Sequence, residues 1–339
     1  MVADGFPHQG PSRENAEMSA QTIELVCAAD ERFLPHAAVL MLSVIEKTRA
    51  PVRVHFLHHD GLAGEMLESL RKMLDASGTP LRTYGVSDEL VRARIGESRP
   101  YSYWYRLLFP ELAPDLDRAL YLDCDVIVVD DLVPLWQTDV SGYLWGAVCN
   151  PLYPSMDHWP LTELALPSLA DYVNSGVLLM NLARMREENV VGKIQAYVSA
   201  HAKIRCPDQD TINALFYRQC LMLHPRWNLQ TTFYELSPRQ IPVPAGQIRE
   251  ALAHPAVVHF ISISKPWHYL SRHPLRHLYA QYRVRTPWPD YELEGREFIY
   301  KLIRPLPPTL QYRVFDWLVA AKSMKKRLAQ FVSSGRARA

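Results

Sequence analysis

The chain has 339 residues, 48% of them hydrophobic and 22% charged, and its 37 basic and 36 acidic side chains give a net charge of +1. This length allows one large or two medium domains with a substantial core. The composition excludes collagenous, low-complexity and wholly disordered proteins, and the balanced charge argues against a nucleic-acid partner. Positions 311–339 nevertheless hold seven basic residues and one acidic residue. The net charge of this tail is therefore +6, and that of residues 1–310 is −5.

Cysteine usage and the N-terminal segment indicate the cellular compartment. The five cysteines are scattered without CxxC spacing, which is typical of reduced thiols in the cytoplasm. Residues 1–20 are polar and of mixed charge, which predicts disorder and argues against a signal peptide. No apolar run approaches the roughly 18 residues of a membrane span. We therefore expect a cytoplasmic protein with at most a peripheral membrane contact.

Short apolar runs alternate with segments of helical spacing along the first 130 residues. The ranges are strands at 22–29, 52–58, 81–86 and 118–129, and helices at 35–48, 65–76 and 103–112. This order predicts an α/β fold with a mostly parallel central sheet covered by helices on both faces. Such sheets bind ligands at the carboxyl ends of their strands. That rule directs attention to Asp30 after the first strand, and to Asp123 and Asp125 in the fourth.

The second half of the chain is less regular. Residues 151–167 are rich in proline and aromatic residues and predict a long loop, and long loops in compact domains are often functional. Further expected elements are an apolar segment at 173–182, helices at 185–200 and 208–216, and strands at 221–224 and 256–261. We expect a single catalytic domain over 21–285, followed by a helical, basic C-terminal tail over 286–339.

The sequence LYLDCDVIVVDD at 120–131 carries the strongest chemical signal. Two carboxylates that follow an apolar strand are costly unless a cation compensates them, and oxygen ligands favour Mg²⁺ or Mn²⁺. The alternative is a strand-end turn with solvated acids. His259 ends another apolar run and is either a core residue or a further ligand, and an imidazole would favour Mn²⁺. Lys265 is either a phosphate contact or a surface lysine.

Three other polar groups have a structural and a functional interpretation. Asp208 opens a predicted helix and suits an N-cap, which leaves Gln209 unexplained. The Asn174–Ser175 pair interrupts an apolar run and needs local partners or a ligand. Arg106 lies in an aromatic-rich helix and forms either an internal ion pair or a ligand contact.

Five motifs occur in an order that resembles the family 8 glycosyltransferases, retaining enzymes that include glycogenin and bacterial lipopolysaccharide galactosyl- and glucosyltransferases. The motifs are CAADERF at 27–33, YRLLFPEL at 105–112, YLDCDVIVVDDLVPLW at 121–136, NSGVLLMNL at 174–182 with PDQDTIN at 207–213, and HFISISKPWH at 259–268. The resemblance covers most of the chain, from about residue 23 to 267. It implies a GT-A fold, a Rossmann-like nucleotide-sugar-binding domain.

The resemblance also implies a role for each matching position. Asp123, Asp125 and His259 would hold Mn²⁺, with Mg²⁺ as the alternative. The UDP part of a UDP-hexose donor would contact Ala28, Asp30, Arg32, Phe33, Cys124, Ser262 and Lys265. The donor sugar would contact Arg106, Asp123, Asn174, Ser175, Asp208 and Gln209, the last two being catalytic. The chain departs from the family where Phe33 replaces a common Tyr, Arg32 a frequent Asn, Ser262 a usual Gly and Leu108 a polar residue.

The implied reaction moves galactose or glucose to a glycan acceptor, such as a lipopolysaccharide or lipooligosaccharide core, with retention of configuration. Because Gln209 is a poor nucleophile, we favour same-face attack within an ion pair over double displacement. Two alternatives are a non-catalytic nucleotide-sugar binder and a haloacid-dehalogenase-type phosphatase that uses Asp123 and Asp125. The phosphatase motif normally lies on the first strand, whereas three predicted strands precede it here.

The C-terminal tail combines apolar and cationic residues in the manner of an interfacial membrane helix. In 310–332, apolar and aromatic residues lie on either side of a cationic cluster. They are Val314, Phe315, Trp317, Leu318 and Ala321 before Lys322, Lys325, Lys326 and Arg327, and Phe331 after them. We expect this tail to attach the protein to anionic lipid on the cytoplasmic face of a membrane. The alternative is a solvated, frayed terminus.

Overall fold

The computed structural model describes residues 22–318, apart from 155, 157, 202, 262–264, 291, 296, 308–309, 312 and 315–316. The expected disorder of 1–20, the contact of Ser262 and the cationic cluster of the tail therefore lie outside the described residues. Among the helices that are described, none has both the length and the apolar character needed to cross a membrane.

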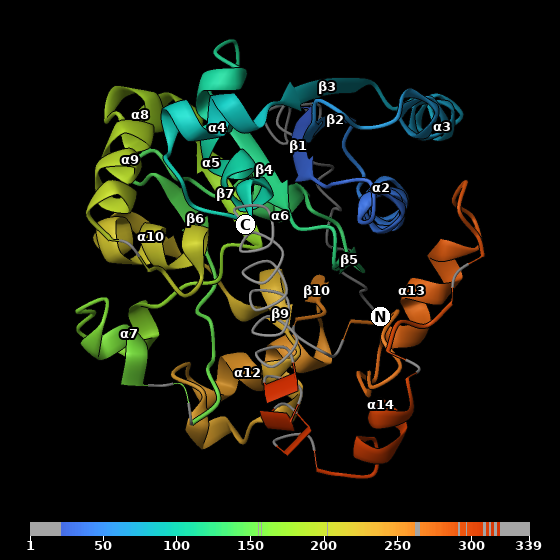
Figure 1. Cartoon of the computed structure of the whole chain (residues 1–339), viewed down its shortest axis with the longest axis vertical. Helices are drawn as coiled ribbons and strands as arrows, with labels where there is room; N and C mark the ends of the chain where they lie inside the picture. The colour runs from blue at the N-terminus through green and yellow to red at the C-terminus, as the bar shows by residue number, and fades with distance from the viewer. Residues whose placement is uncertain are drawn as a thin grey trace, which may run out of the picture.

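A seven-stranded sheet in the order β3-β2-β1-β4-β7-β6-β8 forms the upper half of the molecule in Figure 1. Its strands are β1 (Ile23–Ala28), β2 (Val52–His59), β3 (Leu81–Val86), β4 (Arg118–Leu122), β6 (Trp145–Ala147), β7 (Val177–Asn181) and β8 (Cys220–Met222). Strand β7 is antiparallel to both β4 and β6, whereas the other neighbouring pairs are parallel. The expected mostly parallel sheet is confirmed.

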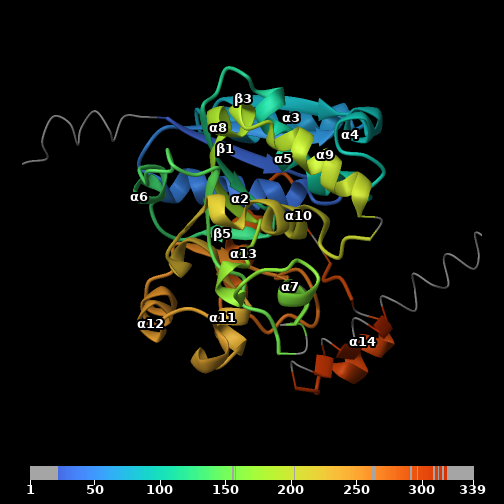
Figure 2. The same ribbon diagram turned by 90° about the vertical axis from the view of Figure 1, so that its left-hand side faces the viewer.

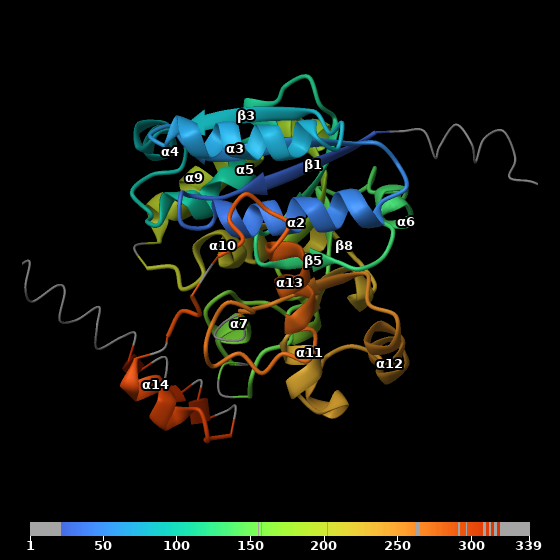
Figure 3. The ribbon, with the colours of Figure 1, turned by 90° about the vertical axis from the view of Figure 1, so that its right-hand side faces the viewer.

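Helices cover both faces of this sheet because the buried strands present apolar side chains on both sides. Leu25 and Cys27 pack in the cluster that includes α2 (Leu34–Lys47) and α3 (Gly64–Asp75). Val26, which lies between them, packs on the opposite side with α5 (Tyr105–Leu112), α8 (Leu182–Glu187) and α9 (Val190–Ala200). Figures 2 and 3 show these two helix layers from opposite sides.

A second, three-stranded sheet lies below the first and carries part of the candidate site. Its order is β5-β10-β9, with β5 at Val126–Val128, β10 at Val257–His259 and β9 at Leu229–Gln230. Strand β10 pairs antiparallel with β5, so that His259 lies opposite Val126. This pairing brings His259 beside the segment that carries Asp123 and Asp125.

The remaining helices are short. They are α4 (Asp88–Arg94), α6 (Val133–Trp136), α7 (His158–Thr162), α10 (Pro207–Phe216), α11 (Thr232–Glu235), α12 (Ala245–Ala253), α13 (Arg276–Arg283) and α14 (Phe298–Ile303). Single 3-10 turns occur at Tyr101–Trp104, Leu169–Asp171, Tyr217–Gln219, Pro225–Asn228 and Pro238–Gln240.

Three elements differ from the sequence prediction, each for a local reason. The strand expected at 118–129 divides into β4 and β5, which belong to different sheets, because the chain turns between Asp123 and Val126. The helix expected at 185–200 divides into α8 and α9 at Asn189, which has a left-handed φ of 48° and caps α9 through its side chain. The loop expected at 151–167 contains α7.

Candidate active site

A cavity of about 570 Å³ opens at the carboxyl ends of β1 and β4, as expected for a sheet of this kind. It gathers most of the candidate site residues into one place. Those that line it are Ala28, Asp30, Phe33, Arg106, Asp123, Cys124, Asp125, Ser175, Asp208, Gln209 and Lys265. Motifs that are far apart in the sequence therefore meet around a single space.

Four of the candidate site residues are not among those that line the cavity. Asn174 and His259 are buried and contact the residues that line the cavity. Arg32 is not part of the lining, and its guanidinium instead pairs with Glu294 at 2.8 Å on the surface. Ser262 lies outside the described residues.

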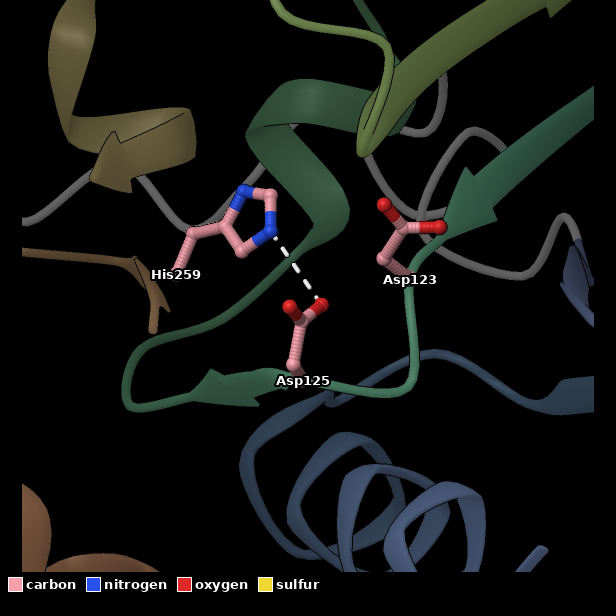
Figure 4. A group of neighbouring side chains, drawn as sticks. All are labelled: Asp123, Asp125 and His259. Atoms are coloured by element: carbon pink, nitrogen blue, oxygen red, sulfur yellow. Dashed lines mark ion pairs between the residues drawn. The ribbon is translucent and has the colours of Figure 1, made fainter. Parts of the chain in front are cut away.

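Asp123, Asp125 and His259 form a group whose potential ligand atoms all lie within 4.8 Å of one another. Figure 4 shows the two carboxylates and the imidazole ring facing a common space. Oδ1 of Asp125 and Nε2 of His259 are 3.2 Å apart. All three side chains are wholly or largely buried, so their charges are poorly screened by water.

The hydrogen bonds around His259 assign its tautomer. Asn228 Nδ2 donates to Asn174 Oδ1 at 2.8 Å, so the other atom of the Asn228 amide, Oδ1, faces His259 Nδ1 at 2.9 Å. Burial lowers the pKa of His259 to about 4, with Arg106 acting in the same direction and Asp123 against it. The neutral ring therefore carries its proton on Nδ1 and directs the Nε2 lone pair at the Asp125 carboxylate. Two acceptors that face each other in this way fit a cation held between them.

Gly176 allows the three candidate ligands to come this close. A Cβ at this position would lie 2.3 Å from Cε1 of His259 and 2.7 Å from Oδ2 of Asp123. The backbone carbonyl of Gly176 accepts a hydrogen bond from the Asp123 N–H at 2.8 Å. The glycine of the NSG motif thus serves close packing against the candidate metal site.

Arg106 links the candidate metal site to α10. Its Nη2 lies 2.9 Å from Oδ1 of Asp123, and its Nε lies 3.3 Å from Oδ2 of Asp208. Arg106 Nε and Asp208 Oδ2 are both buried and neither has a hydrogen-bond partner. The second contact is therefore an ion pair but not a hydrogen bond. Nη1 donates to the Ser175 carbonyl at 2.8 Å, and the guanidinium stacks over the Tyr121 ring. The interpretation of Arg106 as part of an internal ion pair is therefore confirmed. Arg106 also lines the cavity, and a contact with a ligand there stays a prediction.

The pKa values of the two carboxylates that contact Arg106 are shifted in opposite directions. Burial would raise the pKa of Asp123, but the Arg106 guanidinium holds it below its ordinary value. Burial raises the pKa of Asp208, and the neighbouring Asp123 adds to this effect while Arg106 opposes it. Asp208 does not cap α10, whose N-cap is Cys206, so the N-cap interpretation is wrong.

Gln209 is held at both ends of its side-chain amide. Oε1 accepts hydrogen bonds from Asn174 Nδ2 at 3.0 Å and from the Ser175 N–H at 3.2 Å. Nε2 donates to the Tyr172 hydroxyl at 2.7 Å, which in turn donates to Asp210 at 2.8 Å. Burial raises the pKa of Asp210 to about 6. The orientation of Gln209 is thus fixed by four residues.

Lys265 forms an ion pair with Oδ2 of Asp125. Burial lowers the pKa of Lys265, whereas the Asp123 carboxylate raises it. Burial also raises the pKa of the Cys124 thiol well above its ordinary value, so this residue faces the cavity as a neutral group. A cation thus lies directly beside the candidate metal ligands.

Several residues of the site have no signal in the sequence. Asn228 and Tyr172 act through contacts with His259 and Gln209, which only the fold brings near. Tyr103 and Arg205 line the cavity but belong to none of the chemical motifs singled out in the sequence. Tyr103 lies three residues before Arg106, and Arg205 lies three residues before Asp208. This proximity to the motifs is the one signal that could have found these two residues.

Comparisons with known proteins agree with this geometry. The family model "Glycosyl transferase family 8" matches residues 24–271. General stress protein A of Bacillus subtilis is 27% identical over 79% of this chain and 95% of its own. A lipopolysaccharide 1,2-glucosyltransferase of Escherichia coli is 26% identical over 79% of this chain and 80% of its own.

Among solved structures, the galactosyltransferase LgtC in complex with donor and acceptor sugar analogs has a TM-score of 0.69 and 24% identity. The match covers 78% of this chain and 96% of that chain, and it shows that the fold is of the GT-A type. The family model covers well over half of the sequence and includes every motif described above. The chain is therefore a glycosyltransferase and belongs to glycosyltransferase family 8.

Proposed function

We propose that this glycosyltransferase transfers a hexose, galactose or glucose, from a UDP-sugar to a glycan acceptor with retention of the α configuration. The single observation that carries the proposal is the group Asp123, Asp125 and neutral His259 beside a cavity that also contains Lys265. The name of one relative, a lipopolysaccharide 1,2-glucosyltransferase, supports a lipopolysaccharide core or another lipid-linked glycan as acceptor.

Mn²⁺, with Mg²⁺ as the alternative, would be held by Asp123, Asp125 and His259. This donor set fits because two carboxylates and one unprotonated imidazole nitrogen suit a divalent ion of intermediate softness. When bound, the ion supplies positive charge against the departing diphosphate. Lys265 would add a second positive charge to the same group.

The nucleoside would lie against the end of β1. Ala28, Asp30 and Phe33 line the cavity there, together with Cys124. Phe33 offers an aromatic face for the uracil ring. Arg32 is the least supported of the proposed contacts, because its guanidinium is engaged with Glu294.

The contacts of Gln209 favour the same-face mechanism. A nucleophile must direct a free lone pair at the anomeric carbon, but Gln209 Oε1 already accepts two hydrogen bonds. Gln209 would therefore stabilise and position the sugar during attack by the acceptor. Oδ2 of Asp208 is buried without a hydrogen-bond partner, which suits it to receive a sugar hydroxyl.

The two alternatives have less support. A phosphatase of the haloacid-dehalogenase type would need Asp123 as a nucleophile, yet Arg106 and Tyr121 both bind its Oδ1. A non-catalytic sugar-nucleotide binder would not need Asp208, Gln209 and Lys265 to line the cavity as they do. Hydrolysis of p-nitrophenyl phosphate would support the first alternative.

We also propose that the enzyme works on the cytoplasmic face of a membrane, attached through its C-terminal segment. Exposed apolar side chains gather in the described part of that segment, where Phe298 is 74%, Leu302 55% and Trp317 69% exposed. The basic charge of positions 311–339 follows them. Apolar residues followed by cations suit an anionic lipid surface.

A donor panel tests the proposed reaction. The protein is incubated with UDP-galactose, UDP-glucose and other UDP-hexoses in Mn²⁺, and the release of UDP is measured. We expect one of the first two donors to be hydrolysed or transferred at least ten-fold faster than the others, and EDTA to abolish the reaction. Undiminished UDP release in EDTA, or none with any donor, would contradict the proposal.

A further inference from the structure

Three cationic side chains line the cavity, and they differ in what neutralises them. Arg106 pairs with Asp123 and Asp208, and Lys265 pairs with Asp125. The third, Arg205, forms no ion pair with any carboxylate in the part of the chain that the structure describes, and its side chain is exposed. A cation that faces a ligand cavity without a protein counter-charge is available to an anion on the ligand.

The guanidinium of Arg205 is held in place by an aromatic platform. Its Cζ lies 4.8 Å from the ring centroid of Trp159, a cation–π contact. Trp159 is buried on α7 and packs edge-on against Tyr172, with 5.2 Å between ring centroids. Tyr172 accepts the hydrogen bond from Gln209 Nε2. Figure 2 shows α7 beneath α10, the helix that carries Gln209.

Arg205 lines the cavity next to the proposed sugar contacts in the sequence. It precedes α10 by two residues, and α10 carries Asp208 and Gln209, which line the same cavity. The diphosphate is assigned to Lys265 and the candidate metal ligands. The neighbouring Cys206 N–H donates to Asp210 Oδ2 at 2.8 Å, which fixes the backbone beside Arg205.

We propose that Arg205 recognises a carboxylate or phosphate group on the acceptor glycan. This inference rests on the proposed function, whose donors, UDP-galactose and UDP-glucose, carry no anionic group on the sugar. A guanidinium binds either anion through two parallel hydrogen bonds, a geometry that Lys does not offer. Tyr103, which also lines the cavity and is 43% exposed, would donate a further hydrogen bond.

Calorimetric titration of the full chain in Mn²⁺ tests whether the anion belongs to the acceptor. In the acceptor arm, glucuronate and glucose 6-phosphate are compared with glucose, each added to protein saturated with UDP. In the donor arm, UDP-glucuronate is compared with UDP-glucose. We expect the anionic ligands to bind at least ten-fold more tightly than glucose in the acceptor arm, and UDP-glucuronate to bind no more tightly than UDP-glucose in the donor arm.

The substitution Arg205→Gln should remove this preference, and Arg205→Lys should restore only part of it. Arg218→Gln is the matched control, because Arg218 is another exposed arginine that stacks on an aromatic ring, Tyr217, but lies outside the cavity. The control should keep the full preference. If UDP binds but the acceptor arm shows no preference for the anionic ligands, or Arg205→Gln retains that preference, this inference alone is overturned. If UDP does not bind at all, the proposed function falls with it.

Discussion

Nε2 of His259 lies 3.2 Å from Oδ1 of Asp125, and the neutral imidazole brings no proton to this contact. The ring is oriented by Asn228, which accepts the proton of Nδ1. A residue that fixes the tautomer of a ligating histidine is a common feature of metal sites, because it leaves the other nitrogen free to bind. Lys265 also contacts Asp125 and supplies a positive charge there.

Replacement of Gly176 by alanine should damage the candidate metal site without unfolding the protein. The added Cβ would meet His259 and Asp123 at distances that real side chains do not tolerate, so both ligands must move. We expect UDP to bind in Mn²⁺ at least ten-fold more weakly, as measured by calorimetry. Gly246→Ala is the control, because its Cβ meets nothing within 4 Å. Equal affinities in the two variants would show that the glycine is not needed for the site.

Replacement of Gln209 by alanine tests the proposed mechanism. If Gln209 stabilises and positions the sugar, its loss should lower kcat by about 10- to 1,000-fold, the scale of a lost electrostatic contact. The affinity for UDP should change little, because the proposed UDP contacts lie elsewhere. A covalent sugar trapped on Gln209 and identified by mass spectrometry would instead establish double displacement.

Buried His36 should make the protein less stable in mild acid. Burial, assisted by Arg283, lowers its pKa to about 3, and the ring stacks on Trp267 at 3.6 Å. Because the unfolded chain binds this proton near pH 6.5, stability is full above that pH and is lost as the pH falls toward 3. From pH 7 to 5 this loss is about 2 kcal/mol.

The measurement is the free energy of unfolding at pH 7 and pH 5. His36→Gln should show a smaller loss between the two values than the unaltered protein, whatever its stability at pH 7. His254→Gln, at an exposed position, should behave like the unaltered protein. An identical loss in all three proteins would exclude His36 as a source of acid sensitivity.

The proposed membrane attachment predicts a charge-dependent interaction with lipid. Vesicles that contain anionic lipid should sediment the full chain, and neutral vesicles should sediment less of it. Replacement of Lys322, Lys325, Lys326 and Arg327 by glutamine should reduce binding, since each basic residue contributes about 1 kcal/mol near such a surface. Sedimentation that is insensitive to these substitutions and to salt would show that the tail is not the anchor.

Periodicity was sufficient to predict the first half of the central sheet, strands β1 to β4. Strands β1 and β4 are largely buried and mostly apolar, and the carboxylates that follow them mark the edge where the cavity opens. Periodicity could not predict that Asp123–Asp125 separates two sheets, because β5 pairs with β10 from the far end of the chain.

The fold brings most of the candidate site residues predicted from the motifs into one cavity. The residues that hydrogen-bond to them could not be predicted from the sequence. Asn228 and Tyr172 act through single side-chain contacts that depend on tertiary structure. Arg32 was expected near the nucleoside, but Glu294, which is 262 residues away in sequence, draws it to the surface. Local sequence does not encode such distant pairings.

Binding of UDP to the unaltered protein and to Asp125→Asn, with and without Mn²⁺, tests the central claim most directly. Asn keeps the size of the side chain but removes the charge that the candidate metal site needs. We expect Mn²⁺ to strengthen UDP binding at least ten-fold in the unaltered protein and in the surface control Asp75→Asn, but not in Asp125→Asn. Equal strengthening by Mn²⁺ in all three proteins, or in none, would contradict the assignment of Asp123, Asp125 and His259 as the metal site of a nucleotide-sugar transferase.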